Sequence, residues 1–570
     1  MSGRSPHSWG GGLAVLVVAL APALAAVWTV PWFVTQDGPA HVYNAQILAW
    51  SFVPDSPFGS VYTIQWQPIP NWAGHLALAG LVAAWPAWVA DRIMTSVTLV
   101  GLAAATLWLR WRVAGESGMH VAALLAALLA MNLAWLLGFS SFLLGACLFP
   151  ITLGIWWPGR HRLSAPRIAA LSALLTLGYF CHLVSLGLTV LGLVVLSVSA
   201  SPPDGSGSPW RRRLAPLART SVSFIPLVVL AFFYLRIARQ GGPMHPVWQN
   251  LSNPWSPQAW GARLGWADPL TLAIKDGLPF TERVGPAFIL FAPVVWLSVA
   301  SVFWWYGRIT AGPGTLARQQ GGGDIDRQAA AYLTETGTRD DQQGWIILAA
   351  LLIVGGVIGP DSLGAAHGEF LPQRVVLLGL VALVPVFDVN PARWPGLITT
   401  TALAAAVILQ SAIVWDYARY SDRTAGQIIR AGDLVGRDQR IVTLLVTTRG
   451  RFRGNPLLHA ENWLGVDTGN VVWNNYETLH YYFPVQFKAG IERPHPGDLE
   501  LVSIHQKPNE QTDRLRDWER ILSRYADSID VVLVWKSDER LDGITKRWFD
   551  LADRRGDVQV YRRSPPRSRQ

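Results

Sequence analysis

The chain has 570 residues, of which 51% are hydrophobic and only 15% are charged, and its mean hydropathy is positive. This composition excludes an ordinary water-soluble enzyme, a mostly disordered chain and a collagen-like fibre. A disulfide-based scaffold is excluded as well, because the two cysteines, Cys147 and Cys181, fall within apolar runs where packing is expected and pairing is not.

The charged residues divide the chain into two parts. The 155 positions from Asp416 onward hold 47 of the 85 charged residues. We therefore predict a transmembrane domain over residues 1–415, an extracytoplasmic α/β domain over residues 416–562 and a disordered basic tail over residues 563–570.

The first part contains apolar runs long enough to cross a bilayer as helices, and they predict about eleven spans. These runs are 12–33, 92–110, 119–138, 142–157, 168–182, 183–200, 220–236, 285–306, 344–359, 373–388 and 394–415. Residues 168–200 are split at His182, since a single helix there would invert every later span. The first run is alternatively a cleaved signal peptide, but the apolar residues continue to Val34, which favours its retention.

The positions of the basic residues predict the orientation, because Lys and Arg accumulate in short cytoplasmic loops. With the N-terminus inside, 15 of the 22 basic residues before Asp416 fall on the cytoplasmic side. Eleven spans then place the C-terminal domain outside, as expected for an integral protein of a bacterial inner membrane. The net charge of +9 follows from this topology and does not indicate a nucleic-acid partner.

The loop TQDGPAHVYNAQIL after the first span contains the main catalytic candidate, Asp37. A carboxylate beside the membrane is suited to accept a proton from an acceptor hydroxyl or to hold a divalent cation. Asp-Gly-Pro is equally a helix start signal, so an N-cap role is the alternative. An amphipathic helix lying on the membrane would show Asp37, His41 and Asn44 on one face.

Other polar residues gather on the predicted outer side, where they are costly unless they serve a site. The candidate substrate-binding residues are His41, Tyr43, Asn44, His75, His182, Asp268, Glu369 and Arg374. For His75 and His182, each a single histidine at a helix end, a structural role is the commoner alternative. Arg374 opens the tenth span, where it would either reach the interface or neutralise a lipid phosphate.

The sequence contains no P-loop, no Gly-rich dinucleotide motif and no metal-ligand spacing. ATP- or NAD-driven chemistry therefore has no support. A divalent cation is the only cofactor that we consider.

After Trp415 the pattern changes to alternating helices and strands, which predicts a small α/β layer domain. The predicted helices are 417–434, 511–526 and 541–553, and the predicted strands are 440–446, 529–535 and 557–562. Residues 459–487 are rich in Tyr, Trp, Asn and His. We interpret them as an ordinary folded loop with buried aromatic residues; the alternative is a segment that grips a glycan or caps the membrane site.

Three segments resemble those of the GT-C glycosyltransferases, which are polytopic enzymes that use polyprenyl-phosphate sugars. DGPAHVYNA, from Asp37, looks like the acidic first-loop signature of protein O-mannosyltransferases and lipid A aminoarabinose transferases. PNWAGHLALAGL, residues 70–81, is similar to their short apolar outer helix. FLPQRVVLLGLVALVP, residues 370–385, looks like their late helix start, with Arg374 in the arginine position. Gly38 stands where the families have a second acidic residue, and His41 lies one place later than their His or Arg.

The resemblance implies transfer of a sugar from a polyprenyl-phosphate donor to an envelope glycan, lipid or protein on the outer face. Asp37 would act as general base, and Arg374 would lie near the phosphate leaving group. Two alternatives remain. A transporter or flippase of a lipid-linked glycan is expected to show an internal repeat, which we do not find. A catalytically silent relative that only binds glycan is favoured by Gly38.

Overall fold

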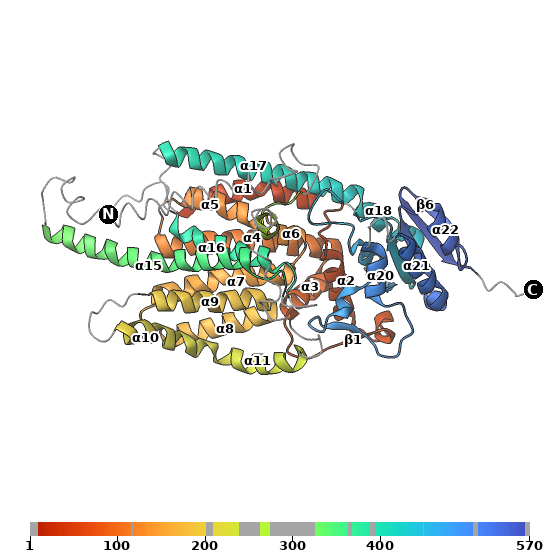
Figure 1. Cartoon of the computed structure of the whole chain (residues 1–570), viewed down its shortest axis with the longest axis horizontal. Helices are drawn as coiled ribbons and strands as arrows, with labels where there is room; N and C mark the ends of the chain where they lie inside the picture. Colours follow the sequence, from red (N-terminus) through yellow and green to blue (C-terminus); the bar gives the residue numbers. More distant parts are fainter. Residues whose placement is uncertain are drawn as a thin grey trace, which may run out of the picture.

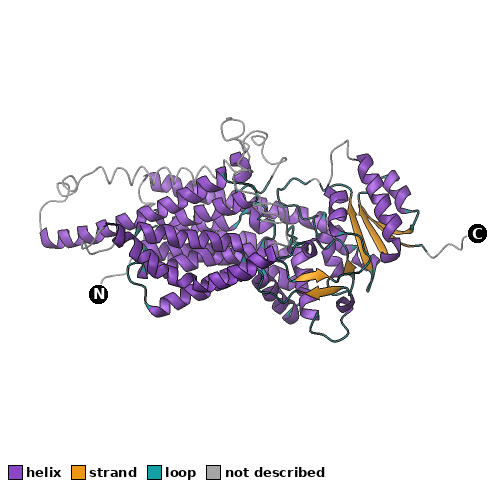
Figure 2. Cartoon of the chain, turned by 60° about the horizontal axis from the view of Figure 1, so that its bottom comes forward, coloured by secondary structure: helices purple, strands orange, loops and turns teal. Residues whose placement is uncertain are grey.

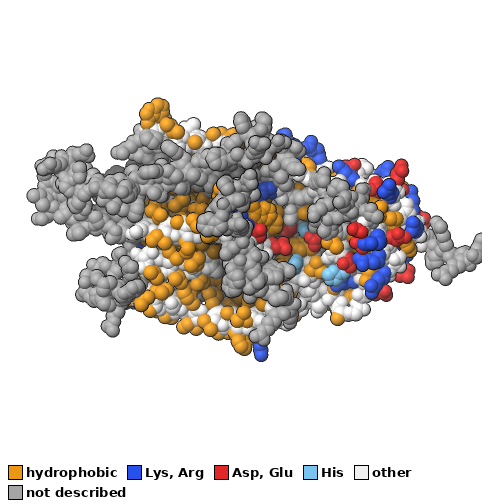
Figure 3. All heavy atoms as spheres, viewed as in Figure 1, with side chains coloured by type: hydrophobic (Ala, Val, Ile, Leu, Met, Phe, Trp, Pro, Cys, Tyr) orange, Lys and Arg blue, Asp and Glu red, His pale blue; other side chains and the backbone are white. Residues whose placement is uncertain are grey.

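The computed structural model describes residues 9–116, 118–200, 209–238, 263–273, 325–362, 368–387, 394–448, 450–504 and 511–564. A bundle of apolar helices forms most of the molecule, and a smaller part with a β-sheet adjoins one end of the bundle (Figure 1). The strands are confined to that end (Figure 2). In Figure 3, hydrophobic side chains predominate where the bundle is drawn in colour, whereas charged side chains gather over the part with the sheet.

One helix, Pro209–Ser221, precedes the predicted span 220–236, and the helix that contains 344–359 begins earlier, at Ile325. Otherwise the helices of the bundle overlap the predicted spans, apart from residues 285–306, which lie outside the described residues. They are α1 (Trp9–Thr29), α4 (Ala87–Ala114), α5 (Met119–Ala130), α6 (Leu133–Leu136), α7 (Ser140–Trp156), α8 (Ala165–Cys181), α9 (Leu183–Ser199), α10 (Pro209–Ser221), α11 (Ile225–Ala238), α15 (Ile325–Ile358), α16 (Leu371–Leu383) and α17 (Trp394–Arg423).

Within the described residues, five helical segments are long and apolar enough to cross a membrane, which marks the chain as an integral membrane protein. They are Trp9–Thr29, Ala87–Ala114, Ser140–Gly159, Leu214–Ala238 and Gly396–Val435. The other apolar helices are shorter, so the number of eleven spans stays a prediction. Both cysteines are buried and free, as predicted.

The apolar run 168–200 is broken at His182, as predicted. The backbone there is extended, with φ −165° and ψ 131°, and the Val184 N–H donates to the His182 side chain at 3.2 Å. This bond caps α9, and α8 and α9 lie side by side in the bundle (Figure 1).

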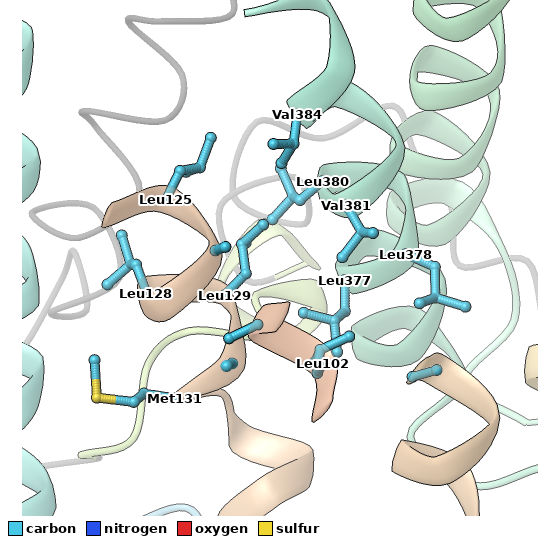
Figure 4. Packing of buried hydrophobic residues seen from close by; sticks show 14 of the residues in the cluster. Leu102, Leu125, Leu128, Leu129, Met131, Leu377, Leu378, Leu380, Val381 and Val384 are labelled. Atoms are coloured by element: carbon cyan, nitrogen blue, oxygen red, sulfur yellow. The ribbon is translucent and has the colours of Figure 1, made fainter. Parts of the chain in front are cut away.

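Leucine and valine side chains from α5 and α16 point toward one another in the centre of the bundle (Figure 4). On its other side α16 approaches α15 closely at Gly379, where an added Cβ would lie 2.9 Å from the Ile353 side chain. Such packing holds α16, and Arg374 on its first turn, in a fixed position.

Two helices lie between the bundle and the sheet: α2 (Gly38–Trp50) and α3 (Trp72–Ala84) (Figure 1). Every residue of α2 from Gly38 to Leu48 is buried, so the predicted amphipathic helix on the membrane surface is wrong. The polar face of α2 contacts the C-terminal part instead: Asn44 bonds to Asn475 and Gln46 to Asp467.

The C-terminal part contains a five-stranded sheet with strand order β3-β2-β5-β7-β6. Its strands are β2 (Arg440–Leu445), β3 (Val471–Val472), β5 (Val531–Trp535), β6 (Phe549–Arg555) and β7 (Val558–Arg563). β3, β2 and β5 are parallel, whereas β7 and β6 are antiparallel to their neighbours. The chain around the sheet forms α18 (Ala425–Arg430), α19 (Gly432–Val435), α20 (Pro496–Ile504), α21 (Gln511–Tyr525) and α22 (Glu539–Thr545).

The predicted helix 541–553 is wrong in its second half, because residues from Phe549 onward form the edge strand β6 and pair with β7. Only Phe549 in this strand is buried. The charged residues that follow Phe549 protect the exposed edge of the sheet from pairing with another chain. Because these residues are mostly charged, the sequence does not indicate a strand here.

Besides the contacts of α2, helix α17 and the short strand β1 (Tyr62–Ile64) connect the bundle to the C-terminal part among the described residues. Helix α17 continues without a break through the predicted boundary at residue 415 and ends at Arg423. Strand β1, from the segment between α2 and α3, pairs antiparallel with β4 (Val485–Phe487). These contacts fix residues 476–487 over α2 and α3.

Candidate functional site

A cavity of about 410 Å³ lies where the bundle meets the C-terminal part. Helices α7, α9 and α16 form one side, which we call the wall, and residues 476–483 of the C-terminal part form the other, which we call the roof. The lining residues are Asp37, His41, Pro70, Asn71, Phe139, Ser141, Phe142, His182, Leu183, Val184, Gly187, Leu188, Tyr234, Gly368, Glu369, Leu371, Arg374, Tyr476, His480, Tyr482 and Phe483.

The carboxylate of Asp37 lines this cavity directly before α2. Asp37 occupies the N-cap position, as the N-cap alternative predicts, but its side chain makes no capping hydrogen bond. Burial raises the pKa of Asp37 to about 6, although His41 and a hydrogen bond from Tyr476 act against this rise. A carboxyl group with this pKa is mostly ionised near pH 7 and able to take up a proton.

No ion pair holds Asp37 among the described residues. The nearest histidine nitrogen, His459 Nε2, lies 3.9 Å from Asp37 Oδ1. Burial lowers the pKa of His459 to about 3, so this ring is neutral. The Asp37 carboxylate therefore remains available to a ligand in the cavity.

Arg374 faces the same cavity from the first turn of α16. Its guanidinium lies 4.5 Å from the centre of the Phe139 ring and 5.2 Å from that of Phe142. Nη1 lies 3.0 Å from His182 Nε2, and the Val184 N–H already donates to the other ring nitrogen of His182. A neutral imidazole accepts through only one nitrogen, so His182 cannot accept fully from both donors.

The buried guanidinium thus has unmet donor capacity. Arg374 is 8% exposed, and its Nε has no hydrogen-bond partner in the part of the chain that the structure describes. Within the described residues, no carboxylate oxygen lies close enough for an ion pair with it. Glu369, another predicted site residue, lines the cavity near Arg374 but is exposed.

The roof is built from the 3₁₀ helix η8 (Tyr476–Leu479) and the residues that follow it. Tyr476 stacks on His459 at 4.1 Å between ring centres, and His480 stacks on Tyr482 at 5.1 Å. Residues 459–487 do bury aromatic side chains, as the ordinary-loop interpretation expects. They also cover the cavity, which is the capping arrangement given as the alternative.

Behind the roof, the Glu477 carboxylate lies between two imidazoles. Its Oε1 is 2.5 Å from His41 Nδ1, and its Oε2 is 2.7 Å from His75 Nε2. Burial alone would raise the pKa of Glu477, but the two histidines lower it to about 2. Burial lowers the pKa of His41, but Glu477, Asp37 and Asp91 together raise it more, so that the net shift is upward.

Asp37, His41, His182, Glu369 and Arg374 are the predicted site residues that the structure brings together around the cavity. His41 and Asn44 also share a face toward residues 475–477, as the spacing from Asp37 predicts.

Four other predicted residues do not line the cavity, because each is bound to nearby protein groups. The Tyr43 hydroxyl donates to the Asn470 carbonyl at 2.8 Å, and Asn44 pairs with Asn475. Asp268 accepts from the N–H groups of Leu270 and Thr271, at 2.8 and 3.0 Å, and so shapes its own turn. His75 contacts Glu477 behind the cavity.

Sequence reasoning did not select any residue of the roof as a site residue. Tyr476, Glu477, His480 and Tyr482 lie about 440 positions after Asp37 in the chain. Two features of the sequence could have indicated the roof residues. Residues 459–487 are rich in aromatic and polar side chains, and the polar face of α2 needs polar groups to contact.

No protein-family model and no curated protein matches the sequence. Among solved structures, the chain is similar to the arabinofuranosyltransferase AftD from Mycobacteria, with 14% identity and a TM-score of 0.41, over 96% of this chain and 40% of AftD. It is also similar to the oligosaccharyltransferase AglB from Archaeoglobus fulgidus, solved with an inhibitory peptide and a dolichol-phosphate. That match has 12% identity and a TM-score of 0.45, over 98% of this chain and 75% of AglB.

This chain spans only two fifths of the length of AftD. At this level of similarity, no substrate, partner or residue role passes from either protein to this chain.

Proposed function

We propose that the protein is a membrane glycosyltransferase that transfers a sugar from a polyprenyl-phosphate donor to a hydroxyl group of an envelope glycan, lipid or protein. The reaction takes place on the outer face of a bacterial inner membrane. The observation that carries this proposal is that Asp37 and Arg374 face one cavity at the end of an apolar helix bundle.

Asp37 has the properties that a general base for this reaction needs. The acceptor oxygen attacks the anomeric carbon of the sugar while the bond from that carbon to the phosphate oxygen breaks. Asp37 takes the proton of the attacking hydroxyl, since its raised pKa keeps it basic and its carboxylate has no ion-pair partner among the described residues. The phosphate leaves on the polyprenyl chain.

Arg374 supplies the complementary charge for the leaving group. Its guanidinium is buried, has unmet donors and is held over two phenylalanine rings. A phosphate would accept the hydrogen bonds that His182 cannot accept in full. Charge that grows on the leaving oxygen in the transition state is stabilised by such a fixed cation.

The wall of the cavity suits a lipid-linked donor. Leu183, Val184 and Leu188 of α9 line it beside the polar groups. Helix α11, which packs on α8, exposes apolar side chains such as Val228 and Phe232, which are 70% and 57% exposed. A polyprenyl tail can lie along these helices in the membrane while its phosphate reaches Arg374.

The direct test measures release of polyprenyl phosphate from a series of polyprenyl-phosphate sugars by the purified full chain. Wild-type protein should release it with at least one donor, and Asp37→Asn should reduce the rate by more than about 100-fold. Asp268→Asn is the matched control, because this acid is also buried but lies outside the cavity. The Asn oxygen can replace Oδ1, which accepts from the Leu270 N–H, and the bond from Thr271 to Oδ2 is lost. This variant should retain the activity.

Two results would count against the proposal. Equal rates for wild type and Asp37→Asn would remove Asp37 as the base. Tight binding of donor without turnover for every sugar would instead support the catalytically silent alternative.

A further inference from the structure

We propose that His41, His75 and Glu477 form a binding site for one divalent metal ion of the zinc class, behind the roof of the cavity. The three residues come from α2, α3 and η8, so the ion would join the bundle to the C-terminal part. The proposal concerns metal binding and does not depend on the proposed sugar transfer.

The donor atoms already converge on one point. One nitrogen from each histidine and a carboxylate oxygen all lie within 4.8 Å of one another. His41, His75 and Glu477 are 5%, 1% and 0% exposed. Two imidazoles and one carboxylate form a common three-ligand set for Zn²⁺ in proteins, with a fourth position left to water or substrate.

The orientation of His75 also suits metal binding. Its Nδ1 lies 3.1 Å from the Asn71 carbonyl oxygen, and its Nε2 lies 2.7 Å from Glu477 Oε2. With an ion at Nε2, Nδ1–H can donate to the carbonyl, as metal-bound histidines usually do.

The ion would need only a small local opening. Metal–ligand distances of about 2.0 to 2.2 Å place tetrahedral ligands about 3.3 Å apart. The closest contacts are now 2.5 and 2.7 Å, so each pair must separate by less than about 1 Å. His41 lines the cavity, and the fourth coordination position is thus expected to face the cavity.

Asp37 fits a metal site less well. The family resemblance pairs this residue with a second acid, whose place Gly38 occupies here. The described groups of three potential ligands do not include Asp37. We therefore place the divalent cation on the histidine pair and not on Asp37.

The test is a Co²⁺ titration of the purified full chain after treatment with a chelator, followed by the visible absorption of four-coordinate Co²⁺. Wild type should bind one Co²⁺ per chain, and Zn²⁺ should displace it. His75→Ala and Glu477→Gln should each weaken Co²⁺ binding by more than about 100-fold. Loss of a residue that only hydrogen-bonds to a metal ligand already lowers metal affinity by about 10- to 100-fold. The control His495→Ala removes an exposed histidine and should bind as wild type does.

Wild type alone can overturn the proposal if it shows no saturable one-to-one binding and its melting temperature does not rise with Zn²⁺. Binding that both ligand variants retain would overturn it as well. Size-exclusion profiles identify a variant that fails to fold, and in that case the wild-type titration decides. One bound ion without any sugar transfer would leave this site standing and remove only the proposed function.

Discussion

One buried carboxylate, Asp37, lies beside the wall of the cavity, and another, Glu477, belongs to the roof. The pKa values of these two carboxylates shift in opposite directions. Burial raises the pKa of Asp37 to about 6. Burial acts in the same direction on Glu477, but two adjacent histidines lower its pKa to about 2. The partners, and not the depth of burial, make the difference. Asp37 is free to react, whereas Glu477 is committed to holding the roof on α2 and α3.

The largest expected effect comes from removing the free carboxylate. Transfer by wild type should fall as the pH drops below about 6, because protonated Asp37 cannot accept the hydroxyl proton. The transfer rate of Asp37→Asn should be about 10²- to 10⁴-fold lower than that of wild type at every pH. A pH–rate profile of both proteins checks this, and a wild-type rate that is unchanged from pH 7 to pH 5 would contradict it.

The same substitution should stabilise the fold, which distinguishes a reactive acid from a structural one. The folded-state pKa of Asp37 lies above its unfolded value of 3.8, so stability is lost as the pH rises from about 4 to about 6. Asp37→Asn removes this loss and should gain up to about 3 kcal/mol at pH 7.5. Melting curves of wild type and Asp37→Asn at pH 4 and pH 7.5 test the sign of this difference. If Asp37→Asn melted at a lower temperature than wild type at pH 7.5, Asp37 would be a structural residue.

Arg374 on the wall should show the next largest effect. Arg374→Ala should reduce the transfer rate by about 10² to 10³, as the loss of one fixed transition-state donor does elsewhere. Arg374→Lys keeps the charge but loses the fork geometry, so its rate should be intermediate. Equal rates for wild type and Arg374→Ala would show that the phosphate binds elsewhere.

Glu477 should give the reverse of the Asp37 result. Its lowered pKa stabilises the fold above pH 4.5, and this stability is lost as the pH falls toward 2. Glu477→Gln should therefore lower the stability at pH 7 by about 3 kcal/mol, since it breaks two buried contacts. Thermal unfolding in the presence of a chelator measures the loss without a metal contribution; an unchanged curve would contradict the role of Glu477 in holding the roof.

The smallest effect is expected from the roof aromatics. Tyr482 lines the cavity and stacks on His480, so Tyr482→Ala should raise the KM for the sugar donor several-fold, whereas Tyr482→Phe keeps the ring and should change it little. Equal KM values in all three proteins would mean that the roof only covers the cavity.

The wall was more predictable from the sequence than the roof. Apolar runs located its helices, and His182 was identified as a break because it interrupts such a run. Asp37 and Arg374 were recognisable because they are charged residues at the predicted outer ends of two spans, in segments that resemble GT-C signatures. Local sequence carries all of these signals.

The roof depends on contacts between distant parts of the chain. His41 and Glu477 are 436 positions apart, and the pairing of β1 with β4 joins segments that show no mutual signal in one sequence. Helix α2 was predicted to lie on the membrane because the sequence shows its polar face but does not show that the C-terminal part contacts this face. Tyr43 and Asn44 were assigned to substrate because their protein partners, Asn470 and Asn475, could not be known.

The most direct test of the account is an experimental structure of the full chain with polyprenyl phosphate bound in a lipid environment. We predict that the phosphate lies within hydrogen-bond distance of the Arg374 guanidinium, with the Asp37 carboxylate facing it across the cavity and the lipid chain along α9. A phosphate bound elsewhere, with Arg374 still against His182, would contradict the assignment of this cavity as the active site.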